Sequence, residues 1–77
     1  MKELVQYIAQ SLVNDPAKVE VNEFDENGSI RIELKVAKED MGRIIGKNGR
    51  VANSIRILLR VAAAREGKHV TLDVLEP

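Results

Sequence analysis

The stretch IIGKNGRVANSI, residues 44–55, places two glycines three positions apart around a lysine and an asparagine. Apolar residues precede these glycines, and a long run with apolar residues at helical spacing follows them. A glycine at each end of so short a segment favours a sharp turn, because glycine adopts backbone angles that other residues avoid. The stretch therefore predicts two helices joined by a turn at residues 46–49.

Two well-known glycine-rich phosphate loops do not fit this stretch. The loop of nucleotide hydrolases has four residues between its first glycine and the Gly-Lys pair, then Ser or Thr, and it follows a strand. Here three residues separate Gly42 from Gly46, Asn48 takes the Ser/Thr position, and a helix is predicted before the loop. The dinucleotide-binding fingerprint also fails, because its first Gly-x-Gly is missing.

A Gly-x-x-Gly turn at the start of a long helix remains, and it has two interpretations. Free N–H groups and a partial positive charge at the helix N-terminus suit a phosphate, with Arg43, Lys47 and Arg50 beside it in the sequence. The turn would serve equally well as a tight corner in which glycine meets only steric needs. The residues of the turn alone leave both interpretations open.

The charge of the chain is divided along the sequence. Basic and acidic residues each number 12, so the formal net charge is zero. Residues 43–68 contain seven basic residues and one acidic residue, whereas residues 1–42 contain five basic and nine acidic residues. This division indicates an anion-binding surface on an otherwise acidic domain, although such a run is also typical of a solvated helix face.

Length and composition indicate one small domain over residues 1–77, since 77 residues leave no room for a second core. Cysteine is absent, which excludes disulfides and thiolate zinc sites and fits a reducing compartment. No apolar run reaches transmembrane length, and residues 1–15 are typical of an amphipathic helix rather than a signal peptide. We therefore expect a cytoplasmic protein with no membrane partner.

Hydrophobic periodicity and turn residues predict six elements in an α+β domain, with helices packed on one face of a three-stranded sheet. An Asn-Gly turn within residues 25–29 is expected to join two antiparallel strands, and Gly67 to cap the long helix. The expected elements are a helix at 4–13, strands at 19–24 and 30–36, helices at 37–45 and 51–66, and a strand at 70–74.

The long helix carries more apolar residues than one buried face needs. Its core-facing residues are predicted to be Val51, Ile55, Leu58, Leu59 and Ala62. A second apolar group lies far around the helix at about 100° per residue, and it consists of Ile57, Val61 and Ala64. This group could form a subunit contact, or its members could be singly exposed side chains, which are common.

The sequence gives little support for a catalytic or metal-binding site. His69 is the only histidine, and no second ligand stands at metal spacing. Glu39 and Asp40 are adjacent carboxylates, but they lie in the first turn of a predicted helix, where negative charge is favourable. We expect no enzymatic activity, no metal and no cofactor.

The segment IIGKNGRVANSI is similar to the signature of the KH domain, in which an Ile-Gly-x-x-Gly turn joins two helices and an apolar residue such as Ile55 follows. The order α-β-β-α-α-β resembles the bacterial, type II, arrangement of that fold, over the entire chain. VAKEDMGRIIGKNGR, AAAREGK and the short length resemble, more narrowly, the bacterial KhpA family of single-KH-domain RNA-binding proteins.

The resemblance implies a site for single-stranded RNA, with the turn contacting the nucleic-acid backbone and about four nucleotides lying in an adjacent groove. Ile44, Ile45, Val51 and Ile55 would form the floor of this groove, with residues 70–72 at its edge. Ile45 and Val51 are expected to be partly open to bases, whereas Ile55 fits an ordinary core position. The RNA-binding residues implied are Arg43, Ile45, Gly46, Lys47, Asn48, Gly49, Arg50, Val51, Ser54, Val70 and Thr71.

The resemblance also implies a small RNA chaperone or post-transcriptional regulator that acts as a homodimer or with a larger KH-containing RNA-binding protein. Dimerisation would use the face formed by Ile57, Val61 and Ala64. The alternative is a protein-interaction subunit that keeps the KH fold as a dimerisation scaffold and has little RNA affinity of its own.

Overall fold

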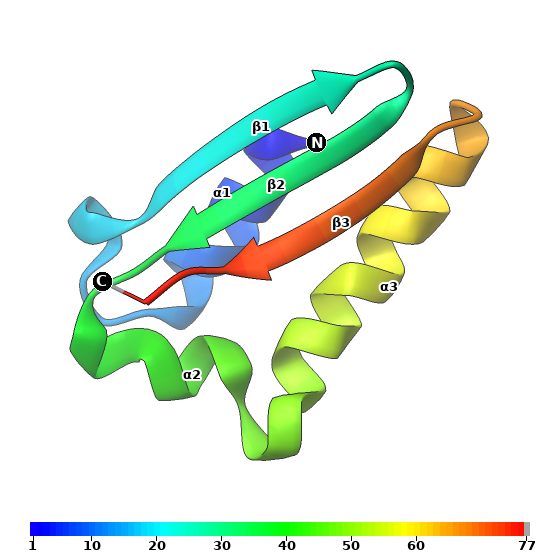
Figure 1. The fold of residues 1–77 in the computed structure, drawn as a ribbon. Coiled ribbons are helices and arrows are strands. Elements are labelled where there is room, and N and C mark those ends of the chain that lie inside the picture. Colours follow the sequence, from blue (N-terminus) through cyan, green and yellow to red (C-terminus); the bar gives the residue numbers. More distant parts are fainter. Residues whose placement is uncertain (77) are drawn as a thin grey trace.

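Three α-helices and three strands follow the predicted order in the computed structural model, which describes residues 1–76 and, at Lys47, the backbone alone. The sheet order is β1-β2-β3, with β1 antiparallel and β3 parallel to β2. The predicted α+β arrangement is confirmed (Figure 1). The elements are α1 (Lys2–Leu12), β1 (Glu20–Glu26), β2 (Ser29–Lys35), α2 (Met41–Ile45), α3 (Arg50–Arg65) and β3 (His69–Val74).

The core lies on one face of the sheet and is centred on β2. Ile30, Ile32 and Leu34 alternate along this strand and are buried, because successive side chains of a strand point to opposite faces. Polar and charged residues alternate with them on the open face. The helices cover the apolar face, and their buried members in the core cluster are Val5, Ala9, Ile44, Ile55 and Leu59.

Two turns have the backbone geometry that the sequence predicts. Asn27 and Gly28, between β1 and β2, have φ angles of 54° and 86°, and two positive values are what a type I′ hairpin turn requires. At the end of α3, Gly67 has φ 67°, and the Lys68 N–H donates to Ala63 O at 2.9 Å. This is the Schellman closure expected of a glycine that follows a helix.

The buried face of α3 differs from the prediction. Leu58 is 53% exposed and Ala62 is half-buried, so the expectation that both face the core is wrong. Ala52 and Ala63 are buried in their place, beside Ile55 and Leu59. Alanine side chains are small and allow a helix to approach its neighbours closely. A prediction that assigns the core face to the larger apolar residues favours leucine and overlooks buried alanines.

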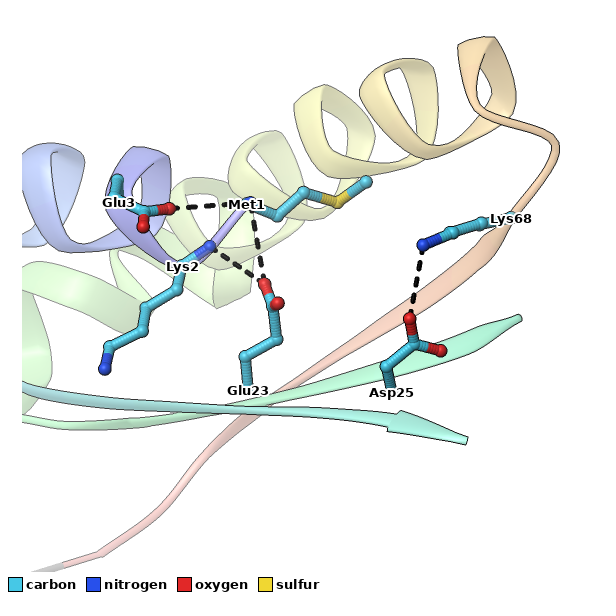
Figure 2. A network of polar contacts seen from close by, with 6 residues as sticks. All are labelled: Met1, Lys2, Glu3, Glu23, Asp25 and Lys68. Carbon is cyan, nitrogen blue, oxygen red and sulfur yellow. Dashed lines mark hydrogen bonds and ion pairs between the residues drawn. The ribbon is translucent and has the colours of Figure 1, made fainter. Parts of the chain in front are cut away.

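Carboxylates continue the core-side row of β1 toward the hairpin (Figure 2). Glu23 Oε1 accepts a hydrogen bond from the Lys2 backbone N–H at 3.0 Å and lies 3.5 Å from the Met1 amino group. Asp25 Oδ2 pairs with Lys68 Nζ at 3.2 Å, and this hydrogen bond raises the pKa of Lys68. These contacts join two segments to β1: the start of α1 and the turn that follows α3.

A buried carboxylate joins the segment after α1 to the start of α2. Asp40 is 2% exposed and accepts hydrogen bonds from the backbone N–H groups of Asn14, at 3.0 Å, and Asp15, at 3.1 Å. Arg43 Nε lies 3.5 Å from its Oδ1. Asp40 therefore has a structural contact that the sequence pattern, a carboxylate near a helix start, does not reveal.

No helix within residues 1–76 is long and apolar enough to cross a membrane.

We predict that Asp40→Ala lowers the free energy of unfolding by about 2 kcal/mol, since two N–H bonds to a buried charged acceptor are lost. Glu39→Ala is the matched control, because Glu39 is the adjacent carboxylate and is exposed; its effect should be below about 0.5 kcal/mol. Urea denaturation measures both variants, and equal losses would contradict the assigned role of Asp40.

Candidate functional site

The turn between α2 and α3 is built from residues with positive φ angles. Gly46 ends α2 with φ 68° and ψ −172°, a region that is essentially restricted to glycine. A 3₁₀ turn at Lys47–Gly49 follows, in which Asn48 is left-handed with φ 55° and ψ 34°. Gly49, also left-handed with φ 79°, is the N-cap of α3. Asn is among the few non-glycine residues that tolerate this conformation, so the composition of the turn matches its backbone.

Two features require glycine at position 46: its backbone angles and the close approach of Val51. A Cβ atom at this position would lie 2.8 Å from Val51 Cβ and would also overlap Val51 Cγ2. At Gly49 the nearest atom to such a Cβ is Asn53 Nδ2, at 4.0 Å. Only Gly46 is therefore required on steric grounds, and its contact with Val51 holds the first turn of α3 against the end of α2.

The beginning of α3 presents polar groups next to exposed cations. Gly49 has no side chain with which to cap the first N–H groups of the helix, which carry the partial positive charge of a helix N-terminus. Asn48 and Arg50 are exposed beside it, whereas Arg43, exposed on α2, is paired with Asp40. The Ser54 hydroxyl donates to Arg50 O at 2.8 Å and is thus engaged within the helix. The side chain of Lys47 lies outside the described residues.

The apolar residues around the turn divide between surface and core. Ile45 is 41% exposed and Val51 is half-buried. Ile44 and Ile55, in contrast, are 0% and 3% exposed and belong to the core. The expectation that Ile44 forms part of a groove floor is therefore wrong, whereas Ile55 takes the ordinary core position that the sequence also predicts. The apolar surface beside the turn therefore consists of Ile45 and Val51, the two residues expected to be partly open.

A hollow of about 300 Å³ lies between α3 and β3. Val70 and Thr71, which the sequence places at the site, line it. Arg56 and Arg60 line it too, although sequence reasoning leaves them out of the site. A signal for them exists in the sequence: two arginines four positions apart occupy one side of α3. The remaining lining residues are Leu59, Leu72 and Asp73.

The free edge of β3 borders this hollow. The N–H of His69 donates to Gly28 O and that of Leu75 to Leu34 O, so odd-numbered residues direct their backbone groups toward β2. The backbone groups of Val70, Leu72 and Val74 therefore point outward, because neighbouring residues alternate. Among residues 1–76 the sheet has no strand beyond β3. This edge is therefore open to another polar molecule, except at the Leu72 carbonyl, which accepts hydrogen bonds from Arg56.

The open face of the sheet is a poor surface for a polyanion. Phe24, its one aromatic residue, is covered by the Arg31 guanidinium at 4.5 Å from the ring centroid. Arg31 is itself paired with Glu33 at 2.6 Å. Alternation places four acidic residues on this face against Arg31 and Lys35; they are Glu20, Glu26, Glu33 and Asp73.

An exposed apolar group runs along the side of α3 that faces away from the core. Ile57 and Val61 are 57% and 52% exposed, and Ala64 is exposed as well. Leu58, at 53%, enlarges the group beyond what the sequence predicts. We call Ile57, Leu58, Val61 and Ala64 the α3 apolar stripe.

Comparisons with known proteins place this chain in one family. The family model described as "KhpA/KhpB, KH domain" matches residues 2–74. The RNA-binding protein KhpA of Caldanaerobacter subterraneus is 53% identical, over 97% of this chain and 100% of the relative. That of Clostridium perfringens is 51% identical with the same coverage, and that of Chlamydia trachomatis is 43% identical over 99% of this chain and 97% of the relative.

A solved structure shares the fold. It is a crystal structure of Aquifex aeolicus Era, with a TM-score of 0.66 and 22% sequence identity. The match covers 97% of this chain and 29% of the Era chain, and at this identity it bears on the fold alone.

We predict that Gly46→Ala lowers the free energy of unfolding by about 3 kcal/mol, through its glycine-only conformation and its overlap with Val51. Gly49→Ala should cost about 1 kcal/mol, the penalty of a left-handed residue in open space. Gly42→Ala is the control, because nothing lies within 4 Å of a Cβ there; it should not destabilise. Thermal unfolding ranks the three variants, and a Gly46→Ala protein as stable as Gly49→Ala would contradict the close approach.

Proposed function

The chain belongs to the KhpA/KhpB KH-domain family, and we propose that it binds single-stranded RNA through the turn at residues 46–49 and the hollow between α3 and β3. Relatives that match this chain over their entire length carry the name RNA-binding protein. The observation that carries the proposal is the Gly46 turn, which leads into a helix N-terminus without a side-chain cap, beside the exposed Arg50.

The phosphate-binding part of the proposed site is largely backbone. The first N–H groups of α3 would donate to a phosphate, and the helix dipole favours negative charge at that end. Gly46 and Gly49 have no side chains, so the RNA backbone can approach the turn closely. Arg43, Lys47 and Arg50 would add attraction that acts over a longer range.

The base-binding part is aliphatic and polar rather than aromatic. Tyr7 and Phe24 are the only aromatic residues, and they lie on α1 and on the open face of β1, so stacking platforms of the kind used by other RNA-binding modules are missing near this site. Ile45 and Val51 would pack against bases, while Val70 and Thr71 line the hollow in which bases would lie. Such contacts support affinities on the order of micromolar for a single module.

The α3 apolar stripe is the proposed protein contact. An exposed group of large aliphatic side chains is typical of an interaction surface, and Leu58 makes it larger than the sequence predicts. We propose that it joins two copies of this chain, or this chain and a larger KH-containing RNA-binding protein. The complex would act in the cytoplasm as a small RNA chaperone or post-transcriptional regulator.

The stripe also supports the second candidate function, a protein-interaction subunit with little RNA affinity of its own. The two functions depend on different residues. RNA binding requires the turn at residues 46–49, whereas the interaction subunit requires Ile57, Leu58 and Val61. Substitutions in each region therefore separate them.

We predict that Lys47→Asp with Asn48→Asp reduces affinity for labelled single-stranded RNA about tenfold or more, because two carboxylates would face the bound phosphate. Aspartate tolerates the left-handed conformation of position 48, so the fold should persist in circular dichroism. Fluorescence anisotropy with a mixed-sequence RNA pool measures the change.

Lys18→Asp with Asn22→Asp is the matched control for this double variant. It makes the same chemical changes at exposed positions near and on β1, the opposite edge of the sheet from β3, and it should bind RNA nearly as the wild type does. Equal affinities of the two double variants would remove the turn as the RNA site. No binding by the wild type would favour the interaction subunit.

We predict that Val61→Glu converts a dimer into a monomer in light scattering, because a charge would be buried at the centre of the stripe. Tyr7→Glu is the control: Tyr7 is 72% exposed on α1, and its substitution should leave the mass at dimer size. A dimeric Val61→Glu protein would show that the stripe is the wrong surface.

A further inference from the structure

Arg56 holds the edge of β3 at the hollow. Its Nε and Nη2 groups both donate to Leu72 O, at 3.3 Å and 3.2 Å. Its Nη1 group donates to Asn53 Oδ1 at 3.0 Å, one turn earlier on α3. Contacts on two sides fix the plane of the guanidinium, which is more restraint than a surface arginine normally has.

The Leu72 carbonyl is consequently removed from the surface that a base would meet. Leu72 is 3% exposed, and its outward carbonyl already accepts two hydrogen bonds from Arg56. An arginine guanidinium has five N–H groups, of which three are used in these contacts. One N–H therefore remains on each Nη atom, and the site offers donors where the bare strand edge would offer an acceptor.

We propose that Arg56 is a specificity-determining residue that selects guanine over adenine at this point of the RNA path. The inference rests on the proposed RNA-binding function and goes beyond it by assigning base selection to one side chain. It depends on the hydrogen bonds of Arg56 and on its place in the lining of the hollow, not on the charge of the region.

The two purines differ in what they present to a pair of donors. Guanine has adjacent acceptors, O6 and N7, which a guanidinium binds in a bidentate manner, whereas adenine has an amino group at N6 beside N7. An amino group needs an acceptor, and the Leu72 carbonyl that could serve is occupied. Adenine at this point would therefore set donors against donors, at a cost that guanine does not incur.

Arg60 provides the internal comparison. It lies one turn after Arg56 and lines the same hollow, but within residues 1–76 no hydrogen bond fixes its guanidinium to β3. Arg60 should add electrostatic attraction for RNA of any sequence, whereas only Arg56 occupies the edge of β3. A comparison of the two separates base selection from general basicity.

The test uses labelled oligouridines that carry either one central guanine or one central adenine, bound to the wild type, Arg56→Lys and Arg60→Lys. Lysine keeps the positive charge but lacks the planar fork of arginine. We expect the wild type to bind the guanine probe about tenfold more tightly than the adenine probe, the discrimination typical of a bidentate contact. Arg56→Lys should bring the two affinities close together, and Arg60→Lys should keep the preference.

Equal affinity of the wild type for both probes would overturn the inference, and so would a guanine preference that persists in Arg56→Lys. A purely structural Arg56 would lower the melting temperature on substitution without changing the ratio of the two affinities. Failure of the wild type to bind either probe would instead overturn the proposed function itself, and the inference with it.

Discussion

The close approach of Gly46 to Val51 is the constraint on which the rest of the site depends. It allows α2 to end and α3 to begin within a few residues, and it fixes the direction in which α3 leaves the turn. That direction brings Ile55 and Leu59 onto the sheet and places Arg56 against the edge of β3. One missing side chain thus determines both the path of the chain at the turn and the hollow between α3 and β3.

Local signals in the sequence predict the elements well, because turn chemistry and alternation are properties of neighbouring residues. The positive φ angles of Asn27 and of Gly67, which caps α3, follow from residue type. The strand that begins near Ile30 follows from the alternation of apolar and polar residues. The exposure of Leu58 and the burial of Ile44 depend on how α2 and α3 are oriented on the sheet. No local pattern contains that orientation, which explains why Leu58 is predicted to face the core and why Ile44 is predicted at the floor of the groove.

The site itself is predictable in part for the same reason. The Gly-x-x-Gly spacing identifies the turn, because its backbone requirement is local. The spacing of Arg56 and Arg60 indicates a shared side of α3, but the contact of Arg56 could not be assigned from the sequence, since it is made to a carbonyl sixteen positions away on another element. The contact of Asp40 could not be predicted for the same reason. Its carboxylate accepts hydrogen bonds from the backbone N–H groups of Asn14 and Asp15, which are distant in sequence and adjacent only in the fold.

The neutral composition conceals a surface on which opposite charges are used differently. Several carboxylates hold the fold together: Asp40 binds the segment after α1, while Glu23 and Asp25 anchor α1 and Lys68 to β1. The open face of the sheet keeps other carboxylates, which would repel a polyanion. A strand of RNA approaching the domain would therefore be oriented toward the arginines of α2 and α3 before any specific contact forms.

Three sides of the helix α3 carry different groups of residues. Ala52, Ile55, Leu59 and Ala63 face the core, the α3 apolar stripe lies on another side, and Arg56 and Arg60 lie between them at the hollow. With about 100° per residue, Arg56 and Val61 point roughly 140° apart. A partner bound to the stripe would thus leave the hollow accessible, and in a symmetric dimer it would hold two such sites in fixed relation. Two weak sites held together on one RNA bind far more tightly than either alone, so under the proposed function the α3 apolar stripe would raise the affinity for RNA without contacting it.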